Sequence, residues 1–119
     1  MKYILLILCF ILPANCVASE KWLVTAYCSC EKCCGKWSDG FVASGKRAKV
    51  GYVANNFLKF GTKLLIKGKV YEVQDRGSKK YFGTKKQRVK HIDIYFDNHQ
   101  NALNWGKKWL DVKILAHKS

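Results

Sequence analysis

The stretch that decides the fold is residues 75–93, DRGSKKYFGTKKQRVKHID, which has an aspartate at each end of a basic, glycine-containing segment. An apolar run precedes it at residues 70–74 (VYEVQ), and another begins within it at residues 92–96 (IDIYF). Both runs are rich in β-branched and aromatic residues, as strands are. We therefore predict that two strands hold Asp75 and Asp93 near each other in a cleft.

The chain has 119 residues, which suggests a single domain. Its first 18 residues have the pattern of a signal peptide: Lys2, an apolar run over residues 3–13, and the small residues of Cys16-Val17-Ala18 before Ser19. The apolar run is too short for a comfortable membrane span. We predict a signal peptide over residues 1–18 and an exported, monomeric domain over residues 19–119, in the periplasm or secreted to the cell wall.

The chain is strongly basic, with 22 Lys and Arg against 8 Asp and Glu, a net charge of +14. Removing residues 1–18 takes away Lys2 alone and leaves +13. Such a charge attracts anionic partners over long range. For an exported protein these are anionic cell-wall polymers rather than nucleic acid. A lysine-rich solvated surface without a specific partner is the alternative.

Four cysteines remain after the leader, and they are packed into seven residues. Two disulfides are the usual outcome in an exported protein. The spacing favours pairings that skip a cysteine, because bridges between the closest pairs would be strained. Four thiolates could instead hold one structural zinc. The residues concerned are Cys28, Cys30, Cys33 and Cys34.

Hydrophobic patterning predicts short strands and one short helix. The helix is expected over residues 99–105, with Asp97 as its N-cap and Gly106 at its end. A further short strand is expected at residues 41–43. The main strands are expected at residues 22–27, 50–54, 63–66, 70–73, 92–96 and 110–115. This set predicts a mainly β domain, a small closed barrel with the helix before its last strand.

A set of motifs occurs in a recognisable order: TAYCSCEKCCGKW, ASG, GYVAN, FGT, YEVQDRG, HIDIYF and ALNWG. Together they resemble the three-aspartate (3D) domain of bacterial cell-wall proteins. That domain is similar to the catalytic domain of membrane-bound lytic transglycosylase A and to the stationary-phase survival muralytic proteins. The resemblance covers roughly residues 22–115. It implies a six-stranded double-psi β-barrel that cleaves the MurNAc–GlcNAc glycan strand of peptidoglycan.

The resemblance also implies roles for particular residues. Asp93 matches the third aspartate, the catalytic acid and base, and Asp75 matches the second, which supports it. The first aspartate is replaced by asparagine within Asn55-Asn56, most simply Asn56. Asparagine can hydrogen-bond a sugar but cannot carry a proton, so a non-catalytic wall-binding barrel is the alternative function. The residues expected to bind substrate are Asn55, Asn56, Tyr27, Trp105, Lys79 and Lys80.

The implied chemistry needs only one carboxyl group and no cofactor. The muramic acid supplies its own nucleophile, the hydroxyl on its sixth carbon, so one residue can act first as acid and then as base. The acid must have a raised pKa. An apolar wall of Ile92, Ile94, Tyr95 and Trp105 is expected to raise it, with the basic residues of the intervening segment pointing outward. His91 is expected at the surface.

Overall fold

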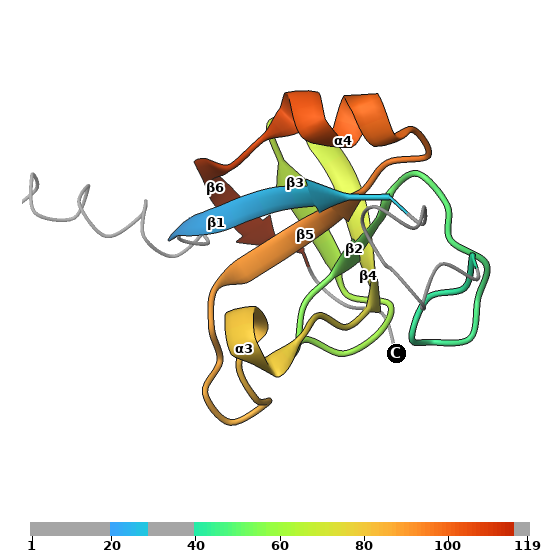
Figure 1. Cartoon of the computed structure of the whole chain (residues 1–119). Helices are drawn as coiled ribbons and strands as arrows, with labels where there is room; N and C mark the ends of the chain where they lie inside the picture. Colours follow the sequence, from blue (N-terminus) through green and yellow to red (C-terminus); the bar gives the residue numbers. More distant parts are fainter. Residues whose placement is uncertain (1–19, 29–39, 116–119) are drawn as a thin grey trace, which may run out of the picture.

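The computed structural model describes residues 20–28 and 40–115, which form a closed barrel of six strands (Figure 1). The order of strands around the barrel is β1-β5-β2-β4-β3-β6. The predicted mainly β, six-stranded barrel is confirmed. The elements are β1 (Glu20–Tyr27), β2 (Tyr52–Ala54), β3 (Lys63–Ile66), β4 (Lys69–Asp75), α3 (Lys79–Phe82), β5 (His91–Tyr95), α4 (His99–Trp105) and β6 (Lys108–Ile114).

Two parallel strand pairs distinguish this barrel from a simple meander. β1 runs parallel to β5, and β2 runs parallel to β4, while the other four neighbouring pairs are antiparallel. Parallel partners cannot be joined by a tight turn, so long crossover segments connect them. As a result, segments far apart in the sequence meet at the middle of the barrel wall.

The core is filled by side chains that alternate along each strand. Ile92 and Ile94 of β5 are 0% and 2% exposed, and they pack with Val24, Val53 and Val73 from the neighbouring strands. Because successive side chains of a strand point to opposite faces, the residues between them lie on the outer face of the barrel. His91, Asp93 and Tyr95 therefore share the outer face of β5.

The strands predicted at residues 63–66 and 70–73 are confirmed as β3 and β4, which pair antiparallel as a hairpin. Its two turn residues, Lys67 and Gly68, have φ of 49° and 78°. Positive φ at both central positions is the condition for the type I′ turn that matches the twist of a hairpin. Gly68 meets this condition without strain.

Three local predictions need correction. Residues 41–43 do not form a strand, since they contribute only one bridge, from Phe41 to Arg47. The segment after Asp75 is not all loop, because it contains the short helix α3. Helix α4 has the predicted bounds, but its N-cap is Asn98, whose side chain accepts a hydrogen bond from the Asn101 amide. Asn98 has the extended backbone that an N-cap requires, so it takes the place expected for Asp97.

The predicted signal peptide lies outside the described residues, as do Cys30, Cys33 and Cys34. Within the part of the chain that is described, no helix has the length and apolar character needed to cross a membrane.

Candidate functional site

The two aspartates lie in one row across the outer wall of the barrel. Strand β2 separates β5 from β4, and Ala54 of β2 is the register partner of both Asp93 and Asp75. Thr25 of β1 continues the row on the other side of Asp93. Neighbouring strands are about 4.8 Å apart, so the two aspartate Cα atoms are separated by about 10 Å. Ala54, which is buried, lies between them.

Asp93 is half-buried, and its Oδ1 lies 2.9 Å from the Thr25 hydroxyl, which can donate a hydrogen bond to the ionised carboxylate. Burial raises the pKa of this carboxyl to about 6. The bond from Thr25 acts in the opposite direction, and the nearby charge of Asp75 adds to the increase. A carboxyl group with such a pKa can hold or release a proton near neutral pH, as a general acid and base must.

The apolar wall expected around Asp93 is only partly present. Ile92 and Ile94 point into the core on the other face of β5. Tyr95 lies on the same face as Asp93, and its ring packs against that of Tyr27 at a steep angle, with the ring centroids 5.6 Å apart. The isoleucine side chains that flank Asp93 therefore do not form the apolar wall that was expected on its face of β5.

Asp75 is held by donors from three parts of the chain. The Tyr27 hydroxyl donates to Oδ2 at 2.6 Å, and the backbone amides of Ala43 and Arg76 donate to Oδ1 at 2.8 and 2.9 Å. Three donors suit an ionised carboxylate, which only accepts. Within residues 20–28 and 40–115 the two aspartates are thus unequal, since three donors contact Asp75 and the Thr25 hydroxyl contacts Asp93.

His91 belongs to the site, and the expectation of a surface histidine was wrong. The side chain is 7% exposed and stacks on Phe82 of α3, with ring centroids 3.9 Å apart. Its Nε2 lies 2.8 Å from the Thr25 hydroxyl and its Nδ1 lies 3.1 Å from the Tyr81 carbonyl oxygen. The sequence signal that could have revealed it is strand alternation, which places His91 and Asp93 on one face of β5.

Asn55 does not support the role predicted for it, because it is fully buried. Its Oδ1 accepts from the amides of Phe57 and Leu58, and its Nδ2 donates to the His91 carbonyl. These bonds shape the turn after β2 and tie it to β5. A side chain enclosed in this way has no surface to offer a sugar.

Asn56 is also engaged within the protein. Its Oδ1 accepts from the Gly77 amide at 2.7 Å, while Nδ2 donates to the carbonyl oxygens of Gly77 and Gly83 at 3.0 and 2.7 Å. These contacts close the ends of the segment that contains α3. An aspartate could accept the first bond but could not donate the other two. The position therefore requires a side chain that both accepts and donates hydrogen bonds, as the asparagine amide does.

The segment of residues 76–90, which we call the flap, presents its charges to solvent. Lys79 and Lys80 are exposed on α3, and the other basic residues between Lys85 and Lys90 are exposed as well. Lys90 forms an ion pair with Glu20. The basic groups thus lie on the surface, as the enzyme interpretation requires.

The two aromatic residues predicted to meet substrate lie in different settings. Tyr27 borders the aspartate row through its bond to Asp75. Trp105 lies on α4, where its Nε1 donates to the Val24 carbonyl and the Lys108 ammonium lies 4.0 Å from the centre of its ring. A cation over a tryptophan face is a favourable contact in itself. One face of this ring is therefore covered by the protein.

Of the four clustered cysteines, the described part of the chain includes Cys28. It is buried, and its Sγ lies 3.4 Å from Nδ1 of His99. Over residues 20–28 and 40–115, no three histidine, cysteine or acidic side chains gather as a metal site. The choice between disulfides and zinc depends on residues outside those ranges.

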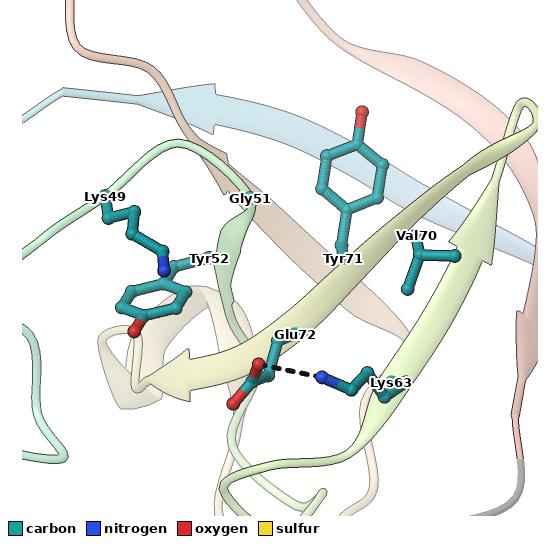
Figure 2. Close-up of a pocket in the computed structure, with 7 residues that line it drawn as sticks. All are labelled: Lys49, Gly51, Tyr52, Lys63, Val70, Tyr71 and Glu72. Atoms are coloured by element: carbon teal, nitrogen blue, oxygen red, sulfur yellow. Dashed lines mark hydrogen bonds and ion pairs between the residues drawn. The ribbon is translucent and has the colours of Figure 1, made fainter.

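A separate open pocket lies on the wall formed by β2, β3 and β4. Figure 2 shows Glu72 and Tyr71 on opposite sides of β4, with the Lys63 ammonium 3.0 Å from Glu72 and the Lys49 ammonium above the ring of Tyr52. Burial raises the pKa of Glu72, but the hydrogen bonds from Gln74 and Lys63, together with the charges of Lys63 and Lys46, lower it below its usual value. With its carboxylate engaged in this way, Glu72 is not a candidate acid, and neither aspartate lines the pocket.

The geometry therefore defines a small β-barrel whose outer wall carries one carboxyl group with a raised pKa beside a second carboxylate. No protein-family profile matches the chain. The chain is similar to the "Putative cell wall shaping protein YabE" of Bacillus subtilis (strain 168), with 31% identity over 93 residues. The match covers 76% of this chain and 21% of YabE, so the chain spans about a fifth of the length of that relative.

Proposed function

We propose that this protein acts on the bacterial cell wall and cleaves the glycan strand of peptidoglycan as a lytic transglycosylase, with Asp93 as acid and base. The observation that carries the proposal is the state of Asp93, a half-buried carboxyl with a pKa near 6 on the outer wall of the barrel. The similarity to a protein named for cell wall shaping supports the choice of substrate.

In the proposed reaction, protonated Asp93 gives its proton to the glycosidic oxygen as the bond from that oxygen to the anomeric carbon breaks. The hydroxyl on the sixth carbon of the muramic acid then bonds to the same carbon and gives its proton to the Asp93 carboxylate. The products are a 1,6-anhydro sugar and a free sugar hydroxyl, and Asp93 is again protonated. One residue therefore serves both proton transfers.

Asp75 supports this cycle by its charge. The nearby carboxylate opposes ionisation of Asp93 and thus keeps the acid form populated. It also stabilises positive charge that develops on the sugar ring as the glycosidic bond breaks. The exposed lysines of the flap suit the carboxylates that the lactyl and peptide groups of peptidoglycan carry.

The test is digestion of purified peptidoglycan, with mass spectrometry of the soluble products. We expect anhydro-muropeptides from the unaltered protein and at least a hundredfold less product from Asp93→Asn, since removal of a general acid typically costs 10²–10⁴-fold. Asp111→Asn is the matched control, because Asp111 is an exposed residue of β6 that pairs with Lys21. Its activity should be unchanged.

The alternative, a wall-binding barrel without activity, remains because Asn56 replaces the first aspartate of the resembled family. The contacts of Asn56 with the flap give it a structural explanation that is compatible with either function. Wall binding without released muropeptides would select the binding module. Products with reducing ends in place of anhydro ends would indicate a hydrolase.

A further inference from the structure

His91, Thr25 and Asp93 form a continuous chain of hydrogen-bond contacts. Nδ1 of His91 lies 3.1 Å from the Tyr81 carbonyl oxygen, and Nε2 lies 2.8 Å from Thr25 Oγ1. Thr25 Oγ1 is in turn 2.9 Å from Asp93 Oδ1. Within the described part of the chain, the third acceptor near this hydroxyl is the Ile92 carbonyl, which competes poorly because it is 3.5 Å away.

The number of hydrogens available to His91, Thr25 and Asp93 limits the protonation states that this series of contacts can adopt. A carbonyl oxygen only accepts, so Nδ1 of His91 carries a hydrogen. The Thr25 hydroxyl has one hydrogen and two close acceptors, Nε2 and Oδ1, and can donate to only one of them. The other contact is satisfied only if the atom facing Thr25 brings its own hydrogen. Either Asp93 is protonated while His91 is neutral, or His91 is charged while Asp93 is ionised.

We propose that His91 is a positioning residue that shares one proton with Asp93 through the Thr25 hydroxyl. The two states interconvert by a balanced shift of two hydrogens. Asp93 Oδ1 gives its proton to Thr25 Oγ1 while Thr25 Oγ1 gives its own to His91 Nε2. The meaning of the relay for catalysis rests on the proposed function, but the shared proton itself does not.

The surroundings favour the state in which Asp93 holds the proton. His91 is enclosed and stacked on Phe82, and burial lowers its pKa, so its neutral form is preferred. When Nε2 of neutral His91 accepts the single hydroxyl hydrogen of Thr25, the Thr25 oxygen can only accept a hydrogen bond from Asp93. A hydroxyl that accepts from a carboxylic acid stabilises the protonated form.

The charged groups around the chain act in the same direction. Asp75 of β4 opposes ionisation of Asp93, and Lys107, between α4 and β6, opposes protonation of His91. The residues of β1 that face the two aspartates are Thr25 and Tyr27, and the Tyr27 hydroxyl donates a hydrogen bond to Asp75. From the flap, the group that meets His91 besides the Phe82 ring is the Tyr81 carbonyl, which favours its protonation less strongly than burial opposes it.

The test is an NMR titration of the purified protein with ¹³C-labelled aspartate and ¹⁵N-labelled histidine, from about pH 4 to about pH 8. We expect the Asp93 carboxyl carbon and His91 Nε2 to show an inflection at the same pH, as coupled groups do. Thr25→Val, which keeps the side-chain shape but removes the hydroxyl, should separate the two midpoints by about one pH unit or more. Thr25→Ser should restore the common midpoint.

His91→Phe provides a second measurement, because it keeps a flat ring against Phe82 but has no nitrogen. Thr25 is then free to donate to Asp93, and we expect the Asp93 midpoint to fall by about one pH unit. If the His91 Nε2 signal of the unaltered protein showed no inflection at the pH at which Asp93 titrates, the relay would be overturned. This result does not depend on whether Thr25→Val folds. An unchanged Asp93 midpoint in folded His91→Phe would also overturn the relay.

Failure of the relay and failure of the proposed function give different results. Coupled titration without release of muropeptides removes the enzyme but keeps the shared proton. Release of anhydro-muropeptides with independent titrations keeps the enzyme and removes the relay. If both hold, the pH profile of glycan cleavage should shift with the Asp93 midpoint in His91→Phe.

Discussion

Asp93 makes the folded protein less stable than it could be, and this gives a first prediction. Its pKa rises from 3.8 to about 6 on folding, so the folded state binds the proton more tightly between these values. Stability contributed by the protonated form is therefore lost as pH rises from about 4 to about 6. Each pK unit corresponds to about 1.4 kcal/mol. At pH 7 we expect Asp93→Asn to be more stable by about 1 to 3 kcal/mol.

Thermal and urea unfolding at several pH values would measure this effect. The gain should shrink as pH falls and disappear below about pH 3, where Asp93 is protonated in both the folded and the unfolded protein. Asp111→Asn again serves as control and should show no such pH-dependent gain, because its ion pair with Lys21 is exposed. A stability difference for Asp93→Asn that does not change with pH would contradict the raised pKa.

Asn56 gives the second prediction at the scale of a single residue. Asn56→Asp introduces the aspartate of the resembled family but removes both donors to the Gly77 and Gly83 carbonyl oxygens. It also places a negative charge beside those oxygens. We expect a loss of about 1 to 3 kcal/mol of unfolding free energy, measured in urea, because partly buried acceptors lose their partners.

The matched control for this change is Asn104→Asp. Asn104 lies on the exposed side of α4, where its Oδ1 accepts from Gln100, and an aspartate can keep that bond. If Asn56→Asp were no less stable than Asn104→Asp, the amide of Asn56 would have no structural role.

At this scale the sequence identified the two aspartates but not their surroundings. Asp93 stands out because a charged residue inside an apolar strand is unusual, and the surrounding motif supported it. The burial of His91 and the internal contacts of Asn56 were not predicted, because the partners of both residues are remote in the sequence. Thr25 is 66 residues from His91, and Gly77 is 21 residues from Asn56. Local sequence patterns do not indicate contacts between residues so far apart.

Among the elements, helix α3 depends on a close approach that leads to the third prediction. A Cβ added at Gly77 would lie 2.2 Å from the Phe82 ring, far inside van der Waals contact. Gly77→Ala must therefore displace Phe82, which also stacks on His91. We expect faster amide hydrogen exchange over residues 79–91, with the barrel strands β3 and β6 unaffected.

Ser78→Ala is the neighbouring control. Ser78 is the N-cap of α3, yet its side chain makes no capping hydrogen bond, so its loss should leave exchange in the flap unchanged. Equal exchange rates in Gly77→Ala and Ser78→Ala would show that Phe82 is not packed against Gly77 in solution.

Elements with a strong periodic pattern were predicted well, and those without one were not. Helix α4 and the hairpin of β3 and β4 combine regular patterning with clear end signals at Gly106 and Gly68. Helix α3 has one turn and a single buried residue, Phe82, so it carries no periodicity. Its position depends on the contacts that Asn56 and Gly77 make after the chain has folded.

The charge of the whole molecule leads to the fourth prediction, which concerns binding to the wall. The flap carries exposed lysines on the segment that ends at His91, so it is the part of the surface placed to meet an anionic polymer near Asp93. We expect Lys79→Glu combined with Lys80→Glu to weaken binding to purified cell walls about tenfold at low salt. Cosedimentation in the Asp93→Asn background, which leaves the wall intact, would measure it.

The control is Lys67→Glu combined with Lys69→Glu, which changes the net charge by the same amount at exposed positions at the other end of β4 from the flap. Binding should fall less in this variant, and both effects should shrink as salt screens the charges. Equal losses in the two double variants would mean that net charge alone governs binding.

For the whole molecule, composition and strand count led to a closed barrel, which the structure confirms. They did not reveal which strands are neighbours. The parallel pairing of β1 with β5 joins the first and fifth strands, and nothing in either segment alone specifies its partner. The row that links Thr25, Asp93, Ala54 and Asp75 could therefore be found only in the folded chain.

The place of β1 in this row has a consequence for the time at which the protein becomes active. β1 precedes the other strands in synthesis, but its threonine meets Asp93 only after a further 68 positions of chain have emerged and paired. Tyr27 likewise reaches Asp75 across 48 positions. A nascent or truncated chain that ends before β5 contains Thr25 and Tyr27 but lacks Asp93. The complete site, with Thr25 next to Asp93 and Tyr27 next to Asp75, therefore forms only when the barrel closes.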